Sequence, residues 1–295
     1  MGGPTRRINA FLERTTGYRL VNASRNGDRD RTTTKRAPAR GRTSGRPPRS
    51  GNPASGTAPR RAGSGGTGKP DFPPDYDELT ADTIRAVRPY TMTSRDKLHA
   101  LITAARYVHE HGVDGSVVEC GVWRGGSMHA VARVLDSYGD HSRDLYLFDT
   151  FEGMPPPGEK DRRHDGRSAE RLLDTSRNDK DKVRAVATLE DVRAGFSDVP
   201  YPEERVHYRP GMVEDTIPTD APEKIAILRL DTDWYASTRH ELRHLYPRLV
   251  SGGVLIIDDY GWWQGSRDAT DEFLAETGEP LLLVRAGTGR IAVKP

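Results

Sequence analysis

Two apolar runs of this sequence end in carboxylates, and these acids are the residues best suited to chemistry. "AILRL" is followed by Asp231 and Asp233, and "GGVLII" is followed by Asp258 and Asp259. If the two runs are neighbouring strands, Asp231, Asp258 and Asp259 converge, and their charges repel unless a cation lies between them. Oxygen ligands of this kind favour Mg²⁺, with Mn²⁺ or Ca²⁺ as alternatives. We expect Asp233 to face away from Asp231, toward the next helix, because side chains of an extended chain alternate in direction.

A glycine-rich turn follows an earlier apolar run, in "VVECGVWRGGS". Its glycines allow a ligand to approach the backbone, and the helix that begins here directs N–H groups to the same place. The spacing differs from the G-x-G-x-x-G of dinucleotide-binding loops, and Glu119 would repel a pyrophosphate. The ammonium and carboxylate of S-adenosylmethionine fit better. The candidate cofactor contacts in this turn are Glu119, Cys120, whose thiol we expect in the core, Gly121 and Ser127.

Two further positions at strand ends suit an adenosine group. Asp149 ends the run "LYLFD", where a carboxylate can accept hydrogen bonds from ribose hydroxyls. The alternative is that Asp149 is the N-cap of a helix that begins at "FEG". Met212 and Val213 follow another strand, in "RPGMVEDTIP", and their apolar side chains can pack against an adenine ring.

Strand-like and helix-like segments alternate in the second half of the chain, which predicts an α/β fold with a mostly parallel sheet and helices on both faces. The predicted strands are residues 116–120, 145–149, 205–211, 224–231 and 253–259, and the predicted helices are 95–111, 128–139, 181–196 and 237–249. We expect the strand order 3-2-1-4-5, with the ligand beyond the carboxyl ends. The C-terminal stretch 280–295 predicts a hairpin that adds an antiparallel strand at the sheet's edge. The long connection 150–204 predicts a binding segment or lid, with "GEKDRRHDGRS" closing over the site.

The charge of the chain divides it into two parts. Residues 1–69 hold 16 Lys and Arg against 3 Asp and Glu, whereas residues 70–295 hold 29 against 40. The first part is rich in Arg, Gly, Pro and Ser, which predicts a largely disordered extension that could contact anionic surfaces. The second part predicts one folded domain. Without a long apolar run or a secretory signal, and with Cys120 as the single cysteine, we expect a cytoplasmic protein that does not insert stably into membranes.

Five segments carry a resemblance to a known family. "TMTSRDKLHAL", "VVECGVWRGGS", "FDTFEGMP", "LRLDTDWYAST" and "GGVLIIDDYG" closely resemble the macrocin/mycinamicin-type (TylF/MycF) sugar O-methyltransferases, in the family's order, from about Tyr90 to Pro295. The resemblance implies a class I S-adenosylmethionine-dependent methyltransferase (Rossmann-like) fold with a seven-stranded sheet, a requirement for Mg²⁺, and a homo-oligomer. The sequence departs from the family at Thr232, where glycine is common, although both neighbouring acids are present.

The resemblance also implies roles for individual residues. Asp231, Asp258 and Asp259 match the family's metal ligands, and Asp231 also matches its base. Segments that match residues 90–93 and 119–121 hold the methionyl part of S-adenosylmethionine, and Asp149 matches the ribose contact. The implied methionyl contacts in the first segment are Tyr90, Thr91, Met92 and Thr93. The acceptor would be a hydroxyl of a sugar or of a phenolic natural product.

Asp231 would remove the acceptor's proton during attack on the sulfonium methyl, and Trp262 and Trp263 could form an apolar wall for the acceptor. Two other functions stay open at this stage. Asp231-Thr232-Asp233 also fits the D-x-D motif of metal-dependent glycosyltransferases, although Glu119 argues against a nucleotide-diphosphate pocket. A non-catalytic binding module with the same fold is the second alternative, and it predicts missing site acids.

Overall fold

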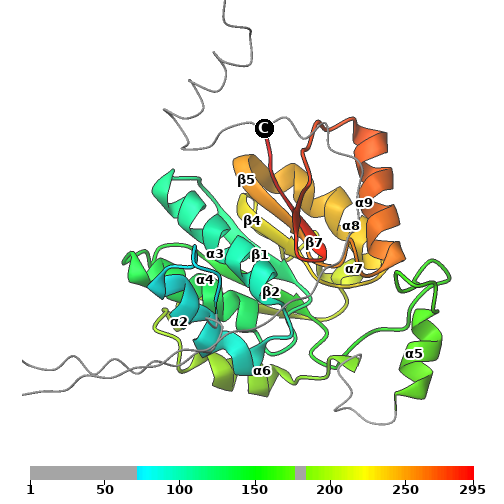
Figure 1. The fold of residues 1–295 in the computed structure, drawn as a ribbon, viewed down its shortest axis with the longest axis horizontal. Coiled ribbons are helices and arrows are strands. Elements are labelled where there is room, and N and C mark those ends of the chain that lie inside the picture. Colours follow the sequence, from blue (N-terminus) through cyan, green and yellow to red (C-terminus); the bar gives the residue numbers. More distant parts are fainter. Residues whose placement is uncertain (1–71, 177–183) are drawn as a thin grey trace, which may run out of the picture. The chain divides into compact units, whose positions relative to one another are not determined.

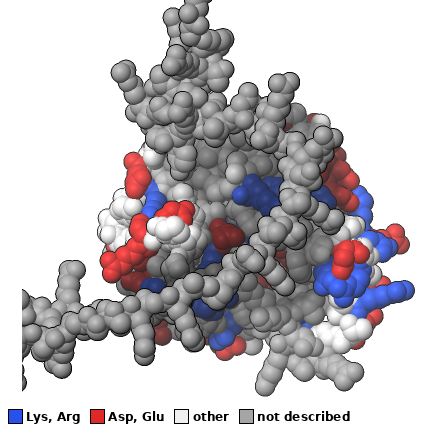
Figure 2. All heavy atoms as spheres, in the orientation of Figure 1, with Lys and Arg blue, Asp and Glu red and all other residues white. Residues whose placement is uncertain are grey.

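The computed structural model of the protein describes residues 72–176 and 184–295. The predicted basic extension, residues 1–69, lies outside the described residues. Among the helices of the described ranges, none is both long and apolar enough to cross a membrane. Figure 2 shows acidic and basic side chains interspersed over the part of the visible face that the described residues form.

The centre of the fold is a seven-stranded sheet in the order β3-β2-β1-β4-β5-β7-β6 (Figure 1). Its strands are β1 (Ser116–Cys120), β2 (Leu145–Asp149), β3 (Val206–Pro210), β4 (Ile225–Leu230), β5 (Leu249–Ile257), β6 (Val284–Ala286) and β7 (Gly289–Val293). The first five are parallel, and their order confirms the predicted 3-2-1-4-5 arrangement. The antiparallel strand was predicted at the edge of the sheet, but β7 pairs with β5 and the outermost strand is β6.

Helices cover both faces of the sheet, as predicted (Figure 1). They are α2 (Glu78–Val87), α3 (Arg95–Glu110), α4 (Gly126–Ser137), α5 (Ala169–Thr175), α6 (Leu189–Phe196), α7 (Val213–Thr216), α8 (Tyr235–Leu245) and α9 (Gln264–Thr277), with short 3-10 turns at Arg88–Tyr90, Glu203–Arg205 and Tyr246–Arg248. The sequence did not predict α2, α5, α7 or α9. It predicted a helix over residues 181–196; residues 181–183 lie outside the described residues, and within 184–196 the α-helix is Leu189–Phe196.

Alternation along the strands separates two apolar cores. Val117 packs with α2, α3, α4 and α6 on one face, whereas its neighbour Val118 packs with α7, α8 and α9 on the other. The same alternation places Glu119 on the face of Val117 and Arg229 on the face of Ile227. Because Glu119 pairs with Arg229 in the β1–β4 register, an acid and a base lie side by side under α3.

The turn after β1 lies directly against the end of β4. Gly121 has φ +82, and a Cβ there would come within 2.1 Å of the Asp231 carbonyl oxygen. The Asp231 amide donates a hydrogen bond to the Cys120 carbonyl at 2.8 Å. A residue without a side chain is therefore required where the glycine-rich turn meets the first acidic strand end.

Candidate active site

Two adjoining cavities lie at the carboxyl ends of β1, β2 and β4. The first, the inner cavity, is lined in part by Asp149, Met212, Val213, Glu214 and Ser237. The second, the acid cavity, is lined in part by Met92, Thr93, Lys97, Asp231, Asp233 and Asp258. Gly121, Asp149 and Asp231 line both, so the two form one continuous site. This is the location expected for a ligand in an open parallel sheet.

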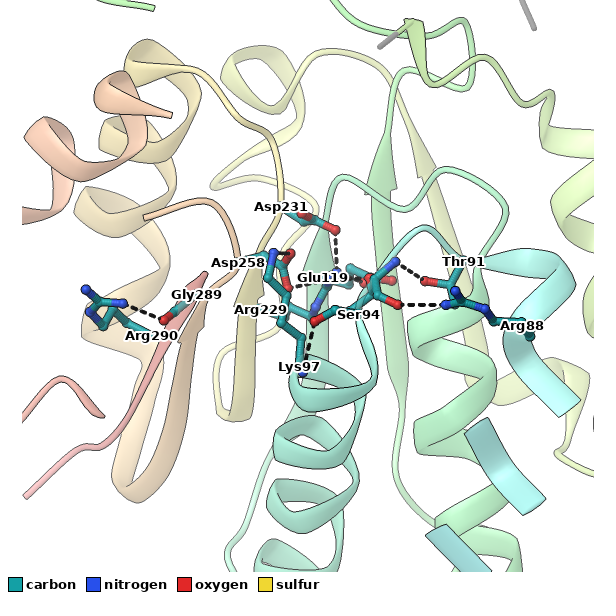
Figure 3. A network of polar contacts seen from close by, with 11 residues as sticks. Arg88, Thr91, Ser94, Lys97, Glu119, Arg229, Asp231, Asp258, Gly289 and Arg290 are labelled. Carbon is teal, nitrogen blue, oxygen red and sulfur yellow. Dashed lines mark hydrogen bonds and ion pairs between the residues drawn. The ribbon is translucent and has the colours of Figure 1, made fainter. Parts of the chain in front are cut away.

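A buried arginine contacts two of the acids that line the acid cavity, Asp231 and Asp258. The Arg229 side chain is 3% exposed, and its guanidinium forms ion pairs with Glu119, with Asp231 at 2.8 Å and with Asp258 at 2.7 Å (Figure 3). These three acids come from the ends of β1, β4 and β5. The sequence analysis missed Arg229, although an arginine within the apolar run "IAILRL" was a signal, since a charge buried in a strand requires a partner.

Asp258 is held by two cations. Its Oδ1 accepts a hydrogen bond from Arg229, and its Oδ2 accepts one from Lys97 Nζ at 2.5 Å. Lys97 stands in the first turn of α3, whose N-cap Ser94 was predicted and accepts a bond from the Lys97 amide. Burial alone would raise the pKa of Asp258, but Arg229 and Lys97 outweigh it and hold this pKa below its usual value.

The carboxylates that converge are Asp231, Asp233 and Asp259, which offer oxygen atoms all within 4.8 Å of one another. Asp258 belongs to the predicted metal set, but in the structure it points to Arg229 and Lys97 instead. The prediction that Asp233 faces away was wrong. The chain is not extended there, because Asp233 has φ +66, and this left-handed conformation turns its side chain back toward Asp231. The α8 N-cap is Trp234, so Asp233 does not cap that helix.

Among the described residues, two of the converging acids, Asp233 and Asp259, form no ion pair, whereas Asp231 pairs with Arg229. Asp259 is 6% exposed, and its buried Oδ2 has no hydrogen-bond partner among the described residues. Burial raises the pKa of Asp259 well above its usual value, and repulsion by Asp233 and Asp258 adds to the shift. Burial likewise raises the pKa of Asp233 to about 7; a hydrogen bond with Asp259 opposes this shift, and repulsion by Asp231 adds to it. A buried acceptor without a donor and mutually repelling carboxylates are the features that a divalent cation would relieve.

Asp149 lies between the two cavities. Its Oδ2 accepts hydrogen bonds from the Val122 and Trp123 amides at 2.6 and 2.9 Å, and its Oδ1 accepts one from the Phe151 amide at 2.8 Å. The carboxylate therefore fixes the glycine-rich turn and its own turn at once. No helix begins at residues 150–153, so the alternative that Asp149 is a helix N-cap was wrong. A contact to a ligand hydroxyl would fall to Oδ1, because Oδ2 already accepts two hydrogen bonds.

The other residues that were predicted to bind the cofactor fall into two groups: those that line one of the two cavities and those that line neither. Met212 and Val213 line the inner cavity, and Met92 and Thr93 line the acid cavity. Those that line neither cavity are Tyr90, Thr91, Glu119, Cys120 and Ser127. Burial raises the pKa of Glu119 to about 7 and the attraction of Arg229 opposes this shift. Glu119 thus contacts the site through Arg229.

The two tryptophans after β5 have different environments. Trp262 is 41% exposed and lines an outer hollow together with Met92 and Lys97. Trp263 is 4% exposed and packs edge-on against Trp234, with ring centroids 5.0 Å apart. Only Trp262 is therefore placed to form a wall for a ligand.

The predicted lid is attached to the body of the site. Backbone hydrogen bonds join His164 to Trp262 at 2.8 Å and Gln264 to Arg162 at 2.7 Å. Asp161, 2% exposed, accepts hydrogen bonds from the Tyr235 amide at 2.8 Å and the Gly158 amide at 2.6 Å. Asp161 was not singled out in the sequence, because its partner at the start of α8 is 74 residues away.

A buried histidine stands behind the predicted methionyl segment. His129 in α4 is 1% exposed, and its ring lies edge-on between Tyr90 and Phe196, with centroids 4.8 and 4.4 Å away. Burial lowers the pKa of His129 to about 4. Since the unfolded chain binds this proton near pH 6.5, stability is lost as the pH falls between these values.

We expect His129 to lower the free energy of unfolding by about 3 kcal/mol between pH 7 and pH 4. Urea unfolding of the wild type and of His129→Phe at several pH values gives the free energy of unfolding of each protein as a function of pH. The contribution of His129 is the difference between these two pH dependences. The substitution keeps an aromatic ring in the site and removes the titration. Parallel pH dependences for the two proteins would contradict the assignment.

Comparison with known proteins identifies the family. The model of the macrocin-O-methyltransferase (TylF) family matches residues 66–284. The 8-demethyl-8-(2,3-dimethoxy-alpha-L-rhamnosyl)-tetracenomycin-C 4'-O-methyltransferase of Streptomyces olivaceus is 37% identical over 189 residues, which are 64% of this chain and 69% of that protein. Demethyldecarbamoylnovobiocin O-methyltransferase of Streptomyces niveus is 34% identical over 187 residues, 63% of this chain and 68% of that protein.

A solved structure supports the same assignment. The O-methyltransferase NovP is similar with a TM-score of 0.61 and 32% sequence identity, over 70% of this chain and 82% of that chain. The seven-stranded mixed sheet agrees with the class I S-adenosylmethionine-dependent methyltransferase fold that the resemblance implied. The comparisons favour neither a glycosyltransferase nor a non-catalytic module. The chain belongs to the TylF macrocin-O-methyltransferase family and is an S-adenosylmethionine-dependent O-methyltransferase.

Proposed function

We propose that the protein is a divalent-cation-dependent O-methyltransferase that acts on a hydroxyl of a sugar or phenolic natural product. The observation that carries the metal requirement is the buried Asp259 Oδ2, which has no partner among the described residues and lies in a group of carboxylates. Oxygen-only ligands favour Mg²⁺. The printed names of the relatives, a rhamnosyl-tetracenomycin and a novobiocin methyltransferase, support an acceptor of this class.

In this proposal Asp231, Asp258 and Asp259 hold the metal, and Asp233 lies close enough to assist. Asp231 and Asp259 are common to the set implied by family resemblance and to the group that converges in the structure. When bound, the metal would lower the pKa of the acceptor hydroxyl. Asp231 removes the proton, since its side chain is 26% exposed and borders both cavities.

The other residues position the two substrates. Asp149, Met212 and Val213 line the inner cavity, where Asp149 would contact the ribose of S-adenosylmethionine and the two apolar side chains would pack against its adenine. Met92 and Thr93 lie on the acid-cavity side, where the sulfonium methyl would meet the acceptor. Trp262 offers an exposed apolar face at the entrance. Holding both reactants in line can lower the barrier by roughly 7–11 kcal/mol.

Chelation tests the metal. Treatment with EDTA is expected to lower methyl transfer at least about a hundredfold, and added Mg²⁺ is expected to restore it, because the converging acids then regain their counter-ion. The assay incubates the protein with S-adenosylmethionine and a panel of hydroxylated sugars and phenols, and reads a gain of about 14 Da by mass spectrometry. Titration with S-adenosylmethionine after chelation is the control for an intact inner cavity. Unchanged methyl transfer in EDTA would contradict the proposed requirement for a divalent cation.

A further inference from the structure

We propose that Lys97 competes with the divalent cation for Asp258, so that the Lys97–Asp258 ion pair must open before this carboxylate can serve as a metal ligand. The inference rests on the metal site of the proposed function and makes Lys97 a positioning residue of that site.

The contacts of Asp258 carry the first step. Arg229 bonds to one of its oxygens at 2.7 Å and Lys97 bonds to the other at 2.5 Å. The Asp258 side chain is 5% exposed, so water contributes little to its environment. A third cation at the same carboxylate would lie within a few ångströms of two positive charges, with little solvent to screen the repulsion. Withdrawal of one of the two present cations would remove this repulsion.

The mobility of the two cations differs, and this identifies Lys97. Arg229 projects from the central strand β4, is 3% exposed and is bound to acids from three strands. Lys97 is 13% exposed, stands in the first turn of α3 and, within residues 72–176 and 184–295, has one salt bridge, to Asp258 (Figure 3). A lysine side chain is long and flexible and has donors that can reorient. Lys97 can thus leave Asp258 without breaking the ion pairs that Arg229 forms with Glu119, Asp231 and Asp258.

The surroundings of Lys97 show where its ammonium can go. Lys97 lines the acid cavity, and it also lines the outer hollow together with Met92 and Trp262. It is therefore at the boundary between the acids and the side from which an acceptor would enter. After release, the ammonium can donate hydrogen bonds to oxygen atoms of a hydroxylated acceptor in this hollow, which a methionine at the same position cannot do.

Mn²⁺ binding, measured by electron paramagnetic resonance on the full chain, tests the competition. Lys97→Met is expected to bind Mn²⁺ about tenfold more tightly than the wild type, because Asp258 no longer has a competing ammonium. Lys224→Met is the matched control, since Lys224 pairs with the exposed Asp114 at 2.7 Å and its substitution changes the net charge equally. We expect the control to stay within about twofold of the wild type.

A double substitution separates competition for Asp258 from a general electrostatic effect. In an Asp258→Asn background that still binds Mn²⁺, the gain from Lys97→Met is expected to disappear. An equal gain in both backgrounds would overturn the proposal, as would unchanged or weaker Mn²⁺ binding by Lys97→Met. If Lys97→Met does not fold, Lys97→Gln removes the same charge.

Activity gives a second measurement. Lys97→Met is expected to raise the KM for the acceptor about tenfold while the affinity for S-adenosylmethionine is unchanged, because the inner cavity does not include Lys97. An unchanged acceptor KM would contradict the acceptor-facing role. If the wild type shows no saturable Mn²⁺ binding, the metal of the proposed function fails. If the wild type binds Mn²⁺ and Lys97→Met binds no more tightly, only the role of Lys97 fails.

Discussion

Asp231→Asn is expected to lower kcat by roughly 10²- to 10⁴-fold, the usual contribution of a positioned general base. Asp231 lies where the two cavities meet, and Arg229 holds its side chain at 2.8 Å. Asparagine preserves the size of the side chain but cannot accept the hydroxyl proton. The rate is measured with saturating S-adenosylmethionine, Mg²⁺ and an acceptor, by the mass gain of the product.

The affinity for S-adenosylmethionine separates this loss from misfolding. We expect calorimetric titration of Asp231→Asn to give a dissociation constant within about tenfold of the wild type, since the inner cavity keeps Asp149, Met212 and Val213. Asp82→Asn, an exposed acid on α2 that pairs with Arg85, is the control for loss of one carboxylate. Full activity in Asp231→Asn would show that another group removes the proton.

Arg229→Met is expected to lower the free energy of unfolding by roughly 3–5 kcal/mol, the range for removing one partner of a buried ion pair. The substitution would leave Glu119, Asp231 and Asp258 without the guanidinium that joins them. Glu119 is 1% exposed, so solvent has little access to replace the lost bonds. Urea unfolding at pH 7 measures the change, and Arg229→Lys is expected to recover part of it because the charge is kept.

Two further variants make the Arg229 result interpretable. Arg85→Met removes an exposed arginine that pairs with Asp82 at 2.6 Å, and we expect a change within about 0.5 kcal/mol. Arg229→Met combined with Glu119→Gln is expected to be more stable than Arg229→Met alone, because one uncompensated charge is removed. Wild-type stability in Arg229→Met would mean that the three acids do not depend on this arginine.

The acids that follow β4 and β5 show which features of the site could be predicted from the sequence and which could not. The sequence predicted that Asp231 and Asp259 follow neighbouring strands, and the β4–β5 pairing confirms this placement. It did not predict that Asp233 turns back toward them, because a single left-handed φ at a non-glycine residue has no reliable sequence signal. The choice between Asp233 and Asp258 as neighbours of Asp231 depends on that one backbone angle and on the cations that hold Asp258.

The sequence by itself determined the α/β class, the order of the five parallel strands, the family and the presence of acids at the strand ends. These follow from local patterns, since hydrophobic periodicity and short motifs are properties of neighbouring residues. Only the tertiary structure decided that Arg229 joins three acids and that Lys97 holds Asp258 across 161 residues of chain. The physical reason is that side-chain partners in a folded core are selected by strand register and helix packing, which bring together residues that no local pattern relates.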